Sequence, residues 1–582
     1  MGLDGSSATK NKRMDTIEEQ KGVTTRVGLA TTPLEMLGLV RKRKRFILEE
    51  LRAEYGDYAA SLIDRNNLAN IFQVSEASRH RFHRRILEKI LTRQLQPSLT
   101  VSIKWVSAGD ASAAGYGNMP EDSYTTIMER TVQEAFATVG LEFVAVNLGI
   151  DGFGSGLEGA LCMDSLYGLD VDFLSWDFAS TDGSQSYRAA LWGVRAERHP
   201  NHPLLVMLDS NDSSRWGRLN RMDGRVGIAL MDQLALQSFR LKYLPDSARF
   251  TNPEQLPPAL QYYQCNGAPE GIVDCNNDAS HFICVDGKGE QCQRHKFRPN
   301  LPCKYQEYHS PWIKGWKEHR LRGRLLGLFL FQLLQDALLE LDATIKDLNT
   351  PVHQSAHQMI DLYRQKKFQD EILTENSPIS PEILGQHAEV MSDLVSPLFE
   401  RPARCQLPDT IFDRHIHENK KQRNLQDNTT SIVTINGGDC PFVGFGHREA
   451  FQVVKNSQAE GFRLDVVPQD LAGSFLIACF RTCTVAGCYK VMDGLDSVKI
   501  ANGNILIEVD GAKVTGSREM DSCHFLEGVH GLHWATEKKG YFSIKFHAKE
   551  EGGSLLLFSV ISMQISAEFS FSERRRHHQV PK

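Results

Sequence analysis

The stretch that decides the fold of this chain is Val101-Ser102-Ile103-Lys104-Trp105-Val106, followed directly by Ser107-Ala108-Gly109-Asp110-Ala111-Ser112-Ala113-Ala114-Gly115. Apolar and polar side chains alternate through the first part, which is typical of a β-strand. The second part consists of small residues with two glycines, which favours a tight turn. The sequence therefore predicts a strand that runs into a polar turn at the carboxyl edge of a sheet.

Three further strand patterns follow this stretch, and helical patterns separate them. An acidic and hydroxyl-rich start at 121–123 precedes a helical pattern that Gly140 ends. Strands are predicted at 143–146, 171–174 and 204–208, and they lead into polar turns at 147–156, 175–178 and 209–212. Alternating strands and helices predict a parallel α/β sheet, in which ligands bind outside the carboxyl ends of the strands.

With these blocks in their order, the segment from Val101 to about Ile345 resembles the SGNH (GDSL-type) hydrolases, a family of esterases and acylhydrolases. The resemblance covers roughly two-fifths of the chain. It implies an α/β fold with a flavodoxin-like three-layer α/β/α domain and a parallel sheet.

In the family the first block reads Gly-Asp-Ser, with a further glycine four residues after the serine. Here Gly109 and Asp110 keep the start and Gly115 keeps the spacing, so the resemblance places Ala111 at the nucleophile position. Ser112 is the neighbouring hydroxyl. One residue further along a turn its side chain should point elsewhere, which favours an N-capping role.

The second and third blocks supply the oxyanion-binding groups in the family. The resemblance places Gly152 at the glycine whose N–H serves this purpose, and that block is retained. It places Asp177 at the position of the asparagine. A carboxylate there would repel a developing oxyanion unless it is protonated. Gly109, Gly152 and Asp177 are the residues expected to form the binding crevice, in the place of the oxyanion-binding groups.

The last block of the family carries the acid and the base. Glu318-His319-Arg320-Leu321 matches the end of that block, which makes His319 the structural histidine. Counting back six residues then puts Ile313 at the catalytic histidine and Ser310 at its acid. His309 lies four residues from the expected position and would need a rearranged loop.

Two functions remain open on these residues. The first is a degenerate hydrolase that acts as a binding or scaffold module for a small acylated or carbohydrate ligand. The second is an active ester hydrolase with a rewired site built from Ser112, His309 or His319, and Asp110. A third reading is an adhesion or extracellular-matrix role led by the C-terminal β region and its cysteines. Fold alone does not decide among them.

Composition limits the classes of protein to which the chain can belong. The chain has 582 residues, a formal net charge of -6, 41% hydrophobic and 24% charged residues, which predicts several domains with ample cores. The net charge argues against nucleic acid as a partner, and basic runs such as 41–45 are typical of solvated helix faces. The apolar run 325–335 is too short for a transmembrane span.

The twelve cysteines and the N-terminal residues point to different cellular compartments. Five lie between 265 and 303 and five between 440 and 523, a clustering that predicts disulfides and a secretory or extracellular setting. The first 35 residues carry no signal-peptide pattern, which favours the cytoplasm, so the localisation stays open. Zinc at the first cluster, with His295, is disfavoured because no Cys-x-x-Cys spacing occurs. We predict no metal and no cofactor.

The predicted organisation has six parts. They are a disordered N-terminus (1–36), a basic helical segment (37–98), the hydrolase-like domain (99–345) with a cysteine-rich insertion (265–303), a helical bridge and linker (346–427), a β-sandwich-like domain (428–572) and a basic tail (573–582). Asp521 and His524 form an Asp-x-x-His pattern inside the β region. We exclude them from a triad because they lie outside the α/β segment.

Overall fold

The computed structural model describes residues 32–115, 123–150, 153–183, 186–208, 226–244, 316–348, 357–363 and 365, together with strands between 404 and 564. Within them a six-stranded sheet has the order β1-β6-β5-β4-β2-β3. Its strands are β1 (Phe72–Val74), β2 (Val101–Gly109), β3 (Leu141–Asn147), β4 (Phe173–Asp177), β5 (Leu204–Met207) and β6 (Ile228–Met231).

Five of the six strands are parallel, which confirms the predicted parallel α/β sheet. Taken in chain order from β2, these five lie in the arrangement 2-1-3-4-5, the flavodoxin-like order. Strand β1 is antiparallel to β6 at the edge. The sequence assigns no strand to this segment, because three residues are too few to show a period of two.

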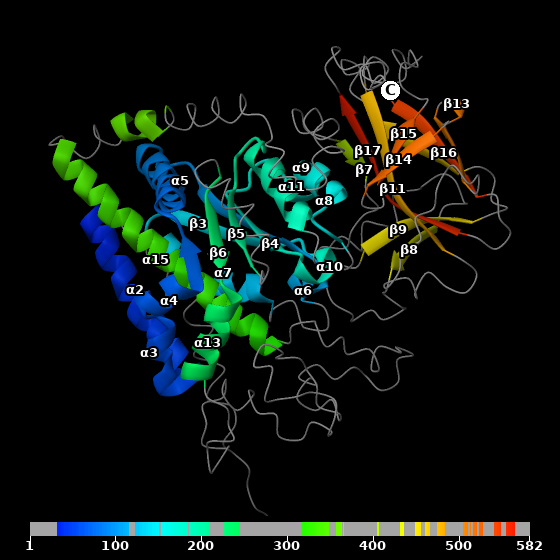
Figure 1. Ribbon diagram of the computed structural model, residues 1–582. Helices are drawn as coiled ribbons and strands as arrows, with labels where there is room; N and C mark the ends of the chain where they lie inside the picture. Colours follow the sequence, from blue (N-terminus) through cyan, green and yellow to red (C-terminus); the bar gives the residue numbers. More distant parts are fainter. Residues whose placement is uncertain are drawn as a thin grey trace, which may run out of the picture.

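Helices cover both faces of the sheet (Figure 1). One core holds Trp105, Phe173 and Val206 of the strands, and the other holds Leu174, Trp176 and Met207, as alternation along a strand requires. The first core is covered by α2 (Pro33–Tyr55), α5 (Glu76–Leu95), α7 (Tyr124–Ala137) and α15 (Trp316–Leu348). The second is covered by α8 (Leu157–Leu161), α9 (Met163–Tyr167) and α11 (Ser186–Glu197).

Local sequence sets where these helices begin. Helix α2 starts with a capping box, in which Thr32 and Glu35 satisfy each other's backbone N–H groups, and Pro33 stands at the first helical position. The helix therefore begins inside the segment that the sequence predicts as disordered. Ser123 caps α7 by accepting from the backbone N–H of Thr126, as the hydroxyl-rich start of that helix predicts.

Short helices complete the described part of the α/β layers. They are α3 (Ala59–Leu62), α4 (Arg65–Ile71), α6 (Ala111–Ala114), α10 (Ala179–Asp182) and α13 (Gln233–Tyr243). Helix α15 packs tightly on α7, because a Cβ on Gly323 would lie 2.6 Å from the Cβ of Ile127. Among the described residues, no helix is both long and apolar enough to cross a membrane.

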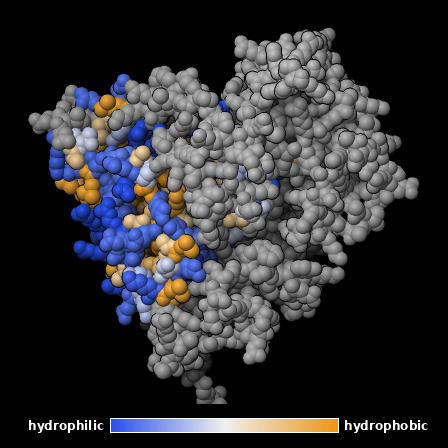
Figure 2. Space-filling view, viewed as in Figure 1, coloured by the Kyte–Doolittle hydropathy of each residue, from blue (hydrophilic) through white to orange (hydrophobic). Residues whose placement is uncertain are grey.

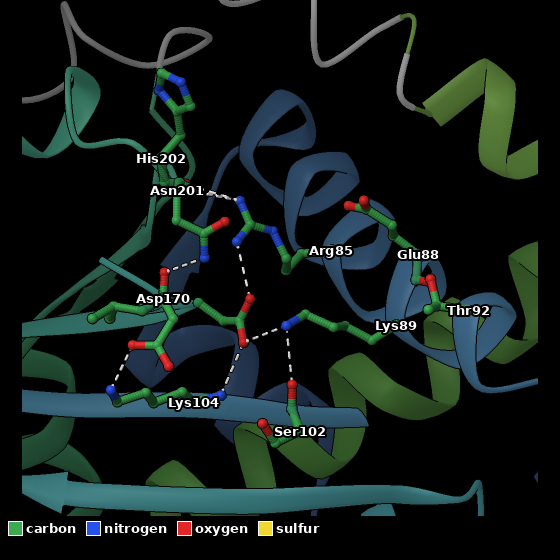
Figure 3. Close-up of polar contacts among 11 residues, drawn as sticks. Arg85, Glu88, Lys89, Thr92, Ser102, Lys104, Asp170, Asn201 and His202 are labelled. Atoms are coloured by element: carbon green, nitrogen blue, oxygen red, sulfur yellow. Dashed lines mark hydrogen bonds and ion pairs between the residues drawn. The ribbon is translucent and has the colours of Figure 1, made fainter. Parts of the chain in front are cut away.

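Polar contacts that involve Arg85, Lys89 and Lys104 hold the start of β4 (Figure 3). Asp172 is fully buried and accepts hydrogen bonds from the Arg85 guanidinium at 3.0 Å and from the backbone N–H of Lys104 at 2.9 Å. The ammonium of Lys89 lies 3.0 Å from its second oxygen. Arg85 also donates to the carbonyls of Asn201 and His202. The network therefore joins α5, β2, β4 and the start of β5.

In Figure 2 the described part of the surface is mostly hydrophilic, and hydrophobic residues form small separate groups on it. Large apolar side chains such as Leu234, Leu241 and Leu169 are more than half exposed.

The described residues between 404 and 564 form β-strands. They are β7 (Arg404–Gln406), β8 (Ser431–Ile435), β9 (Arg448–Val454), β10 (Glu460–Asp465), β11 (Ser474–Cys483), β12 (Ile505–Val509), β13 (Ala512–Lys513), β14 (Gly516–Met520), β15 (Cys523–Glu527), β16 (Tyr541–Ala548) and β17 (Ser554–Gln564). They form one sheet in the order β10-β16-β12-β13 and another in the order β14-β15-β11-β17-β9-β8, with β7 beside β17. The predicted domain boundaries and the β-sandwich assignment stay predictions.

Candidate functional site

The candidate site lies at the carboxyl ends of β2 and β4. This is the switch point of the flavodoxin-like strand order, where ligands bind in open α/β sheets. Gly109 pairs with Asp177, and the backbone N–H of Asp110 donates to the carbonyl of Asp177 at 3.0 Å. A Cβ on Gly109 would lie 2.4 Å from that carbonyl oxygen, so only glycine fits.

Asp110 follows β2 and ties two loops together. One carboxylate oxygen accepts from the backbone N–H of Ser112 at 2.9 Å, and the other accepts from that of Thr181 at 3.0 Å. The side chain is 1% exposed. Asp110 thus caps α6 and fixes α10 against it.

Ala111 is the first residue of α6, and Ser112 is the second. The Ser112 side chain is 4% exposed, and its Oγ has no hydrogen-bond partner among the described residues. The turn closes at Gly115, whose N–H donates to the Ser112 carbonyl and whose φ of +74° favours glycine.

The second polar turn follows β3 and packs on α6. The Asn147 amide donates to the carbonyl of Ala113 at 2.9 Å, and its oxygen accepts from the N–H of Gly149 at 3.1 Å. A Cβ on Gly149 would lie 2.3 Å from the backbone nitrogen of Ala114, so this glycine permits the contact. Sequence reasoning did not single out Gly149, although it is a glycine within the predicted turn. Gly152 lies outside the described residues.

A buried pair joins the second and third turns. The Asp182 carboxylate accepts from the N–H of Ser155 at 3.0 Å and from its hydroxyl, and both residues are at most 2% exposed. The Arg188 guanidinium lies 3.5 Å from the same carboxylate. No local pattern predicts this pair, because its members are 27 residues apart, one in the turn after β3 and the other at the end of α10.

The Asp177 side chain lies near Tyr124 of α7. It is 1% exposed and lies close enough to Tyr124 for its charge, after burial, to raise the pKa of the Tyr124 hydroxyl well above its ordinary value. Its backbone carbonyl, rather than its carboxylate, contacts the first turn. The structure therefore brings Gly109, Asp110 and the Asp177 backbone together.

His319 packs against Tyr124 at the start of α15. The two rings stack with centroids 5.5 Å apart, and Nδ1 of His319 accepts from the backbone N–H of Tyr124 at 3.2 Å. Because Nδ1 is the acceptor, a neutral ring carries its proton on Nε2. The histidine is fully buried and does not hydrogen-bond Ser112. His309, Ser310 and Ile313 lie outside the described residues.

A buried charge cluster anchors α13 to α15 beside His319. Glu318 accepts from Arg240 of α13 and from Nε of Arg322 at 2.6 Å, and Arg322 also donates to Gln233. The three charged residues are at most 2% exposed. A cluster paired in this way holds the helices in position around the site.

Fold and site together define an α/β protein with a mostly parallel sheet and a tightly tied turn at its switch point. No family model and no curated protein matches the chain. Among solved structures, it is similar to a two-domain esterase (CEX) active on acetylated mannans, with 12% identity, a TM-score of 0.37, and coverage of 85% of this chain and 97% of that chain. The same esterase co-crystallized with mannopentaose matches with 12% identity, a TM-score of 0.34, and coverage of 80% and 92%.

Proposed function

We propose that the α/β part of this chain is a hydrolase-like module that binds its ligand without a serine nucleophile. The first turn carries this proposal. Ala111 stands where the resemblance expects the nucleophile, and Asp110 uses both carboxylate oxygens for backbone N–H groups. A buried carboxylate with these partners is a tie between loops and is not placed to move a proton.

The geometry around Ser112 supports the same proposal. An activated serine needs a base within roughly 2.6–3.2 Å of its Oγ. Ser112 has no such partner among the described residues, and Nδ1 of His319 already accepts from Tyr124. The described histidine of the last block therefore supports packing rather than general-base chemistry.

The proposed ligand is a small acylated or carbohydrate molecule bound at the ends of β2 and β4. The family that the sequence resembles acts on esters, and buried hydrogen bonds from Thr181 and Ser155 fix the backbone of the loops at this edge of the sheet. A few fixed polar groups at a switch point are typical of a small-ligand site.

The test is hydrolysis of 4-nitrophenyl acetate by the full chain, combined with binding of an O-acetylated oligosaccharide measured by calorimetry. Three variants accompany the wild type: Ser112→Ala, Ala111→Ser, and Ser165→Ala as an exposed-serine control. We expect binding without turnover in the wild type. We also expect no turnover in Ala111→Ser, because under this proposal no base serves the turn, and none is found among the described residues. Wild-type turnover or absent binding of every acylated probe would overturn the proposal.

The second candidate is an ester hydrolase that uses Ser112. One observation favours it: the Ser112 hydroxyl is buried and has no hydrogen-bond partner among the described residues, so it is available to a base from another loop. His309 is the sequence candidate for that base. In this case the wild type and Ser165→Ala turn over the ester, and Ser112→Ala and His309→Ala do not.

A further inference from the structure

Helices α5 and α15 lie side by side (Figure 1) and bring two histidines to one glutamate. His80 and His83 are three residues apart on α5 and therefore share a face. Glu340 lies opposite them on α15. Its Oε2 is 2.7 Å from Nδ1 of His83 and 3.8 Å from Nδ1 of His80. One ligand atom from each residue lies within 4.8 Å of the other two.

Burial differs within this cluster in a way that suits an ion. His83 is 5% exposed, and its Nδ1 contacts Oε2 of Glu340. The His80 side chain is 56% exposed and that of Glu340 is 37% exposed. The buried histidine gives a fixed ligand, and the exposed one leaves an entry path and room for water.

A second carboxylate stands behind His80. Oε1 of Glu76, one turn earlier on α5, is 3.8 Å from Nε2 of His80. Histidines that bind metals through one nitrogen commonly direct the other ring N–H to a carboxylate, which orients the ring. Glu76 therefore stands on the side of His80 that faces away from Glu340.

Helical residues 357–363 include Tyr363, which lies near enough to Glu340 to be affected by its charge. Tyr363 is partly buried there, and burial, followed by the charge of Glu340, raises the pKa of its hydroxyl to about 12. The carboxylate of Glu340 is thus a significant local charge. A cation bound to it is favoured for the same reason that the tyrosinate is disfavoured.

We propose that Nδ1 of His80, Nδ1 of His83 and Oε2 of Glu340 bind a divalent transition-metal ion of the zinc class. Imidazole nitrogens suit Zn²⁺, Cu²⁺ and Ni²⁺, and two histidines with one carboxylate leave a fourth position to water. Bonds of about 2.0–2.2 Å require ligand atoms to lie roughly 3.3 Å apart. Reaching this value requires the exposed His80 ring to rotate toward the other two ligands and the Glu340 carboxylate to move back from Nδ1 of His83, which it now contacts at 2.7 Å.

The site is structural and is separate from the candidate crevice. Glu340 lies 21 residues after His319 in the same continuous helix, which is roughly 30 Å at the α-helical rise. A metal at this position joins α5 to α15 at the end of α15 that is remote from the crevice. It stabilises the folded chain because it binds the folded state alone.

The test is calorimetric titration of the full-length protein with ZnCl₂. His80→Ala and Glu340→Gln each remove one ligand. Glu88→Gln is the control, because it removes a carboxylate of α5 that lies outside the cluster. His80 is exposed, so His80→Ala retains the fold, which circular dichroism checks. Other cysteines and histidines can bind zinc, so the readout is the difference between variants.

We expect the wild type and Glu88→Gln to bind one more equivalent of zinc than His80→Ala and Glu340→Gln, or to bind it at least about tenfold more tightly. The thermal midpoint should rise with zinc in the first two proteins and rise less in the other two. Indistinguishable isotherms for all four proteins would overturn the proposal and leave a plain hydrogen bond between His83 and Glu340.

Discussion

At the scale of single residues, the conformation of the first turn depends on the hydrogen bonds of Asp110 and on glycines that allow close backbone contacts. Asp110 accepts the N–H of Thr181, 71 residues away, and Gly149 lies against the backbone of Ala113 and Ala114. The sequence predicts the turn and its polar character from local pattern. It does not predict these partners, because a pairing between distant turns leaves no local period.

Gly149→Ala tests the contact between the second turn and α6. The new Cβ would lie 2.3 Å from the backbone nitrogen of Ala114, so the loops must separate. We expect a loss of about 1–3 kcal/mol in the free energy of unfolding, measured by urea denaturation. Gly38→Ala is the control, because a Cβ there meets nothing within 4 Å and the position is helical, so alanine should stabilise by about 0.5–1 kcal/mol. Equal effects of the two substitutions would contradict this account.

At the scale of elements, the sequence predicts the strands and helices that show a local pattern of apolar and polar residues. The strands β2, β3 and β5 and the helices α7 and α15 follow from alternation, hydroxyl capping and apolar periodicity. Strand β1 is too short to show a pattern. The network around Asp172 was missed because Arg85, Lys104 and Asp172 come from three elements and carry no motif.

Asp172→Ala tests how α5 is joined to the sheet. It leaves the buried Arg85 guanidinium without its carboxylate, which costs about 3–5 kcal/mol. Asp170→Ala is the matched control: its carboxylate also contacts Lys104, at 2.6 Å, but its side chain is 75% exposed, so the expected loss is at most about 1 kcal/mol. Chemical denaturation of both variants gives the comparison. A loss for Asp170→Ala as large as that for Asp172→Ala would refute the assignment.

The contact between α2 and α15 predicts a dependence on pH. Burial raises the pKa of Glu54, but hydrogen bonds and charges from Arg324 and Arg320 outweigh burial and hold the pKa below its ordinary value. The folded pKa is lower than the unfolded one. The contribution of Glu54 to stability is therefore fully present above about pH 4.5 and is lost as the pH falls through the folded-state pKa.

Glu54→Gln should remove that contribution. We expect the variant to lose about 1.5–3 kcal/mol of unfolding free energy at pH 7, because hydrogen bonds from two arginines lose their charged acceptor. The difference between the variant and the wild type should shrink below pH 4.5. Denaturation curves at pH 7 and pH 3.5 measure it, and a difference that is equal at both values would exclude the ion pair as its source.

At the scale of the whole molecule, Cys523 of β15 connects the C-terminal strands to the α/β layers. Its side chain is fully buried in the same core cluster as Cys162, which lies between α8 and α9. We predict that the two thiols form a disulfide. Peptide mapping of the unreduced protein should recover a cross-linked peptide that reduction separates. Free, alkylatable thiols at both positions would refute the link.

The central claim is that this hydrolase-like module does not use a serine nucleophile. The most direct measurement is labelling of the intact, full-length protein with a fluorophosphonate probe, followed by peptide mapping, with Ser112→Ala treated in parallel. The buried Ser112 Oγ has no described base, and Ala111 has no hydroxyl, so we predict no adduct on 101–115. An adduct on Ser112 that disappears in Ser112→Ala would contradict the claim and establish an active ester hydrolase.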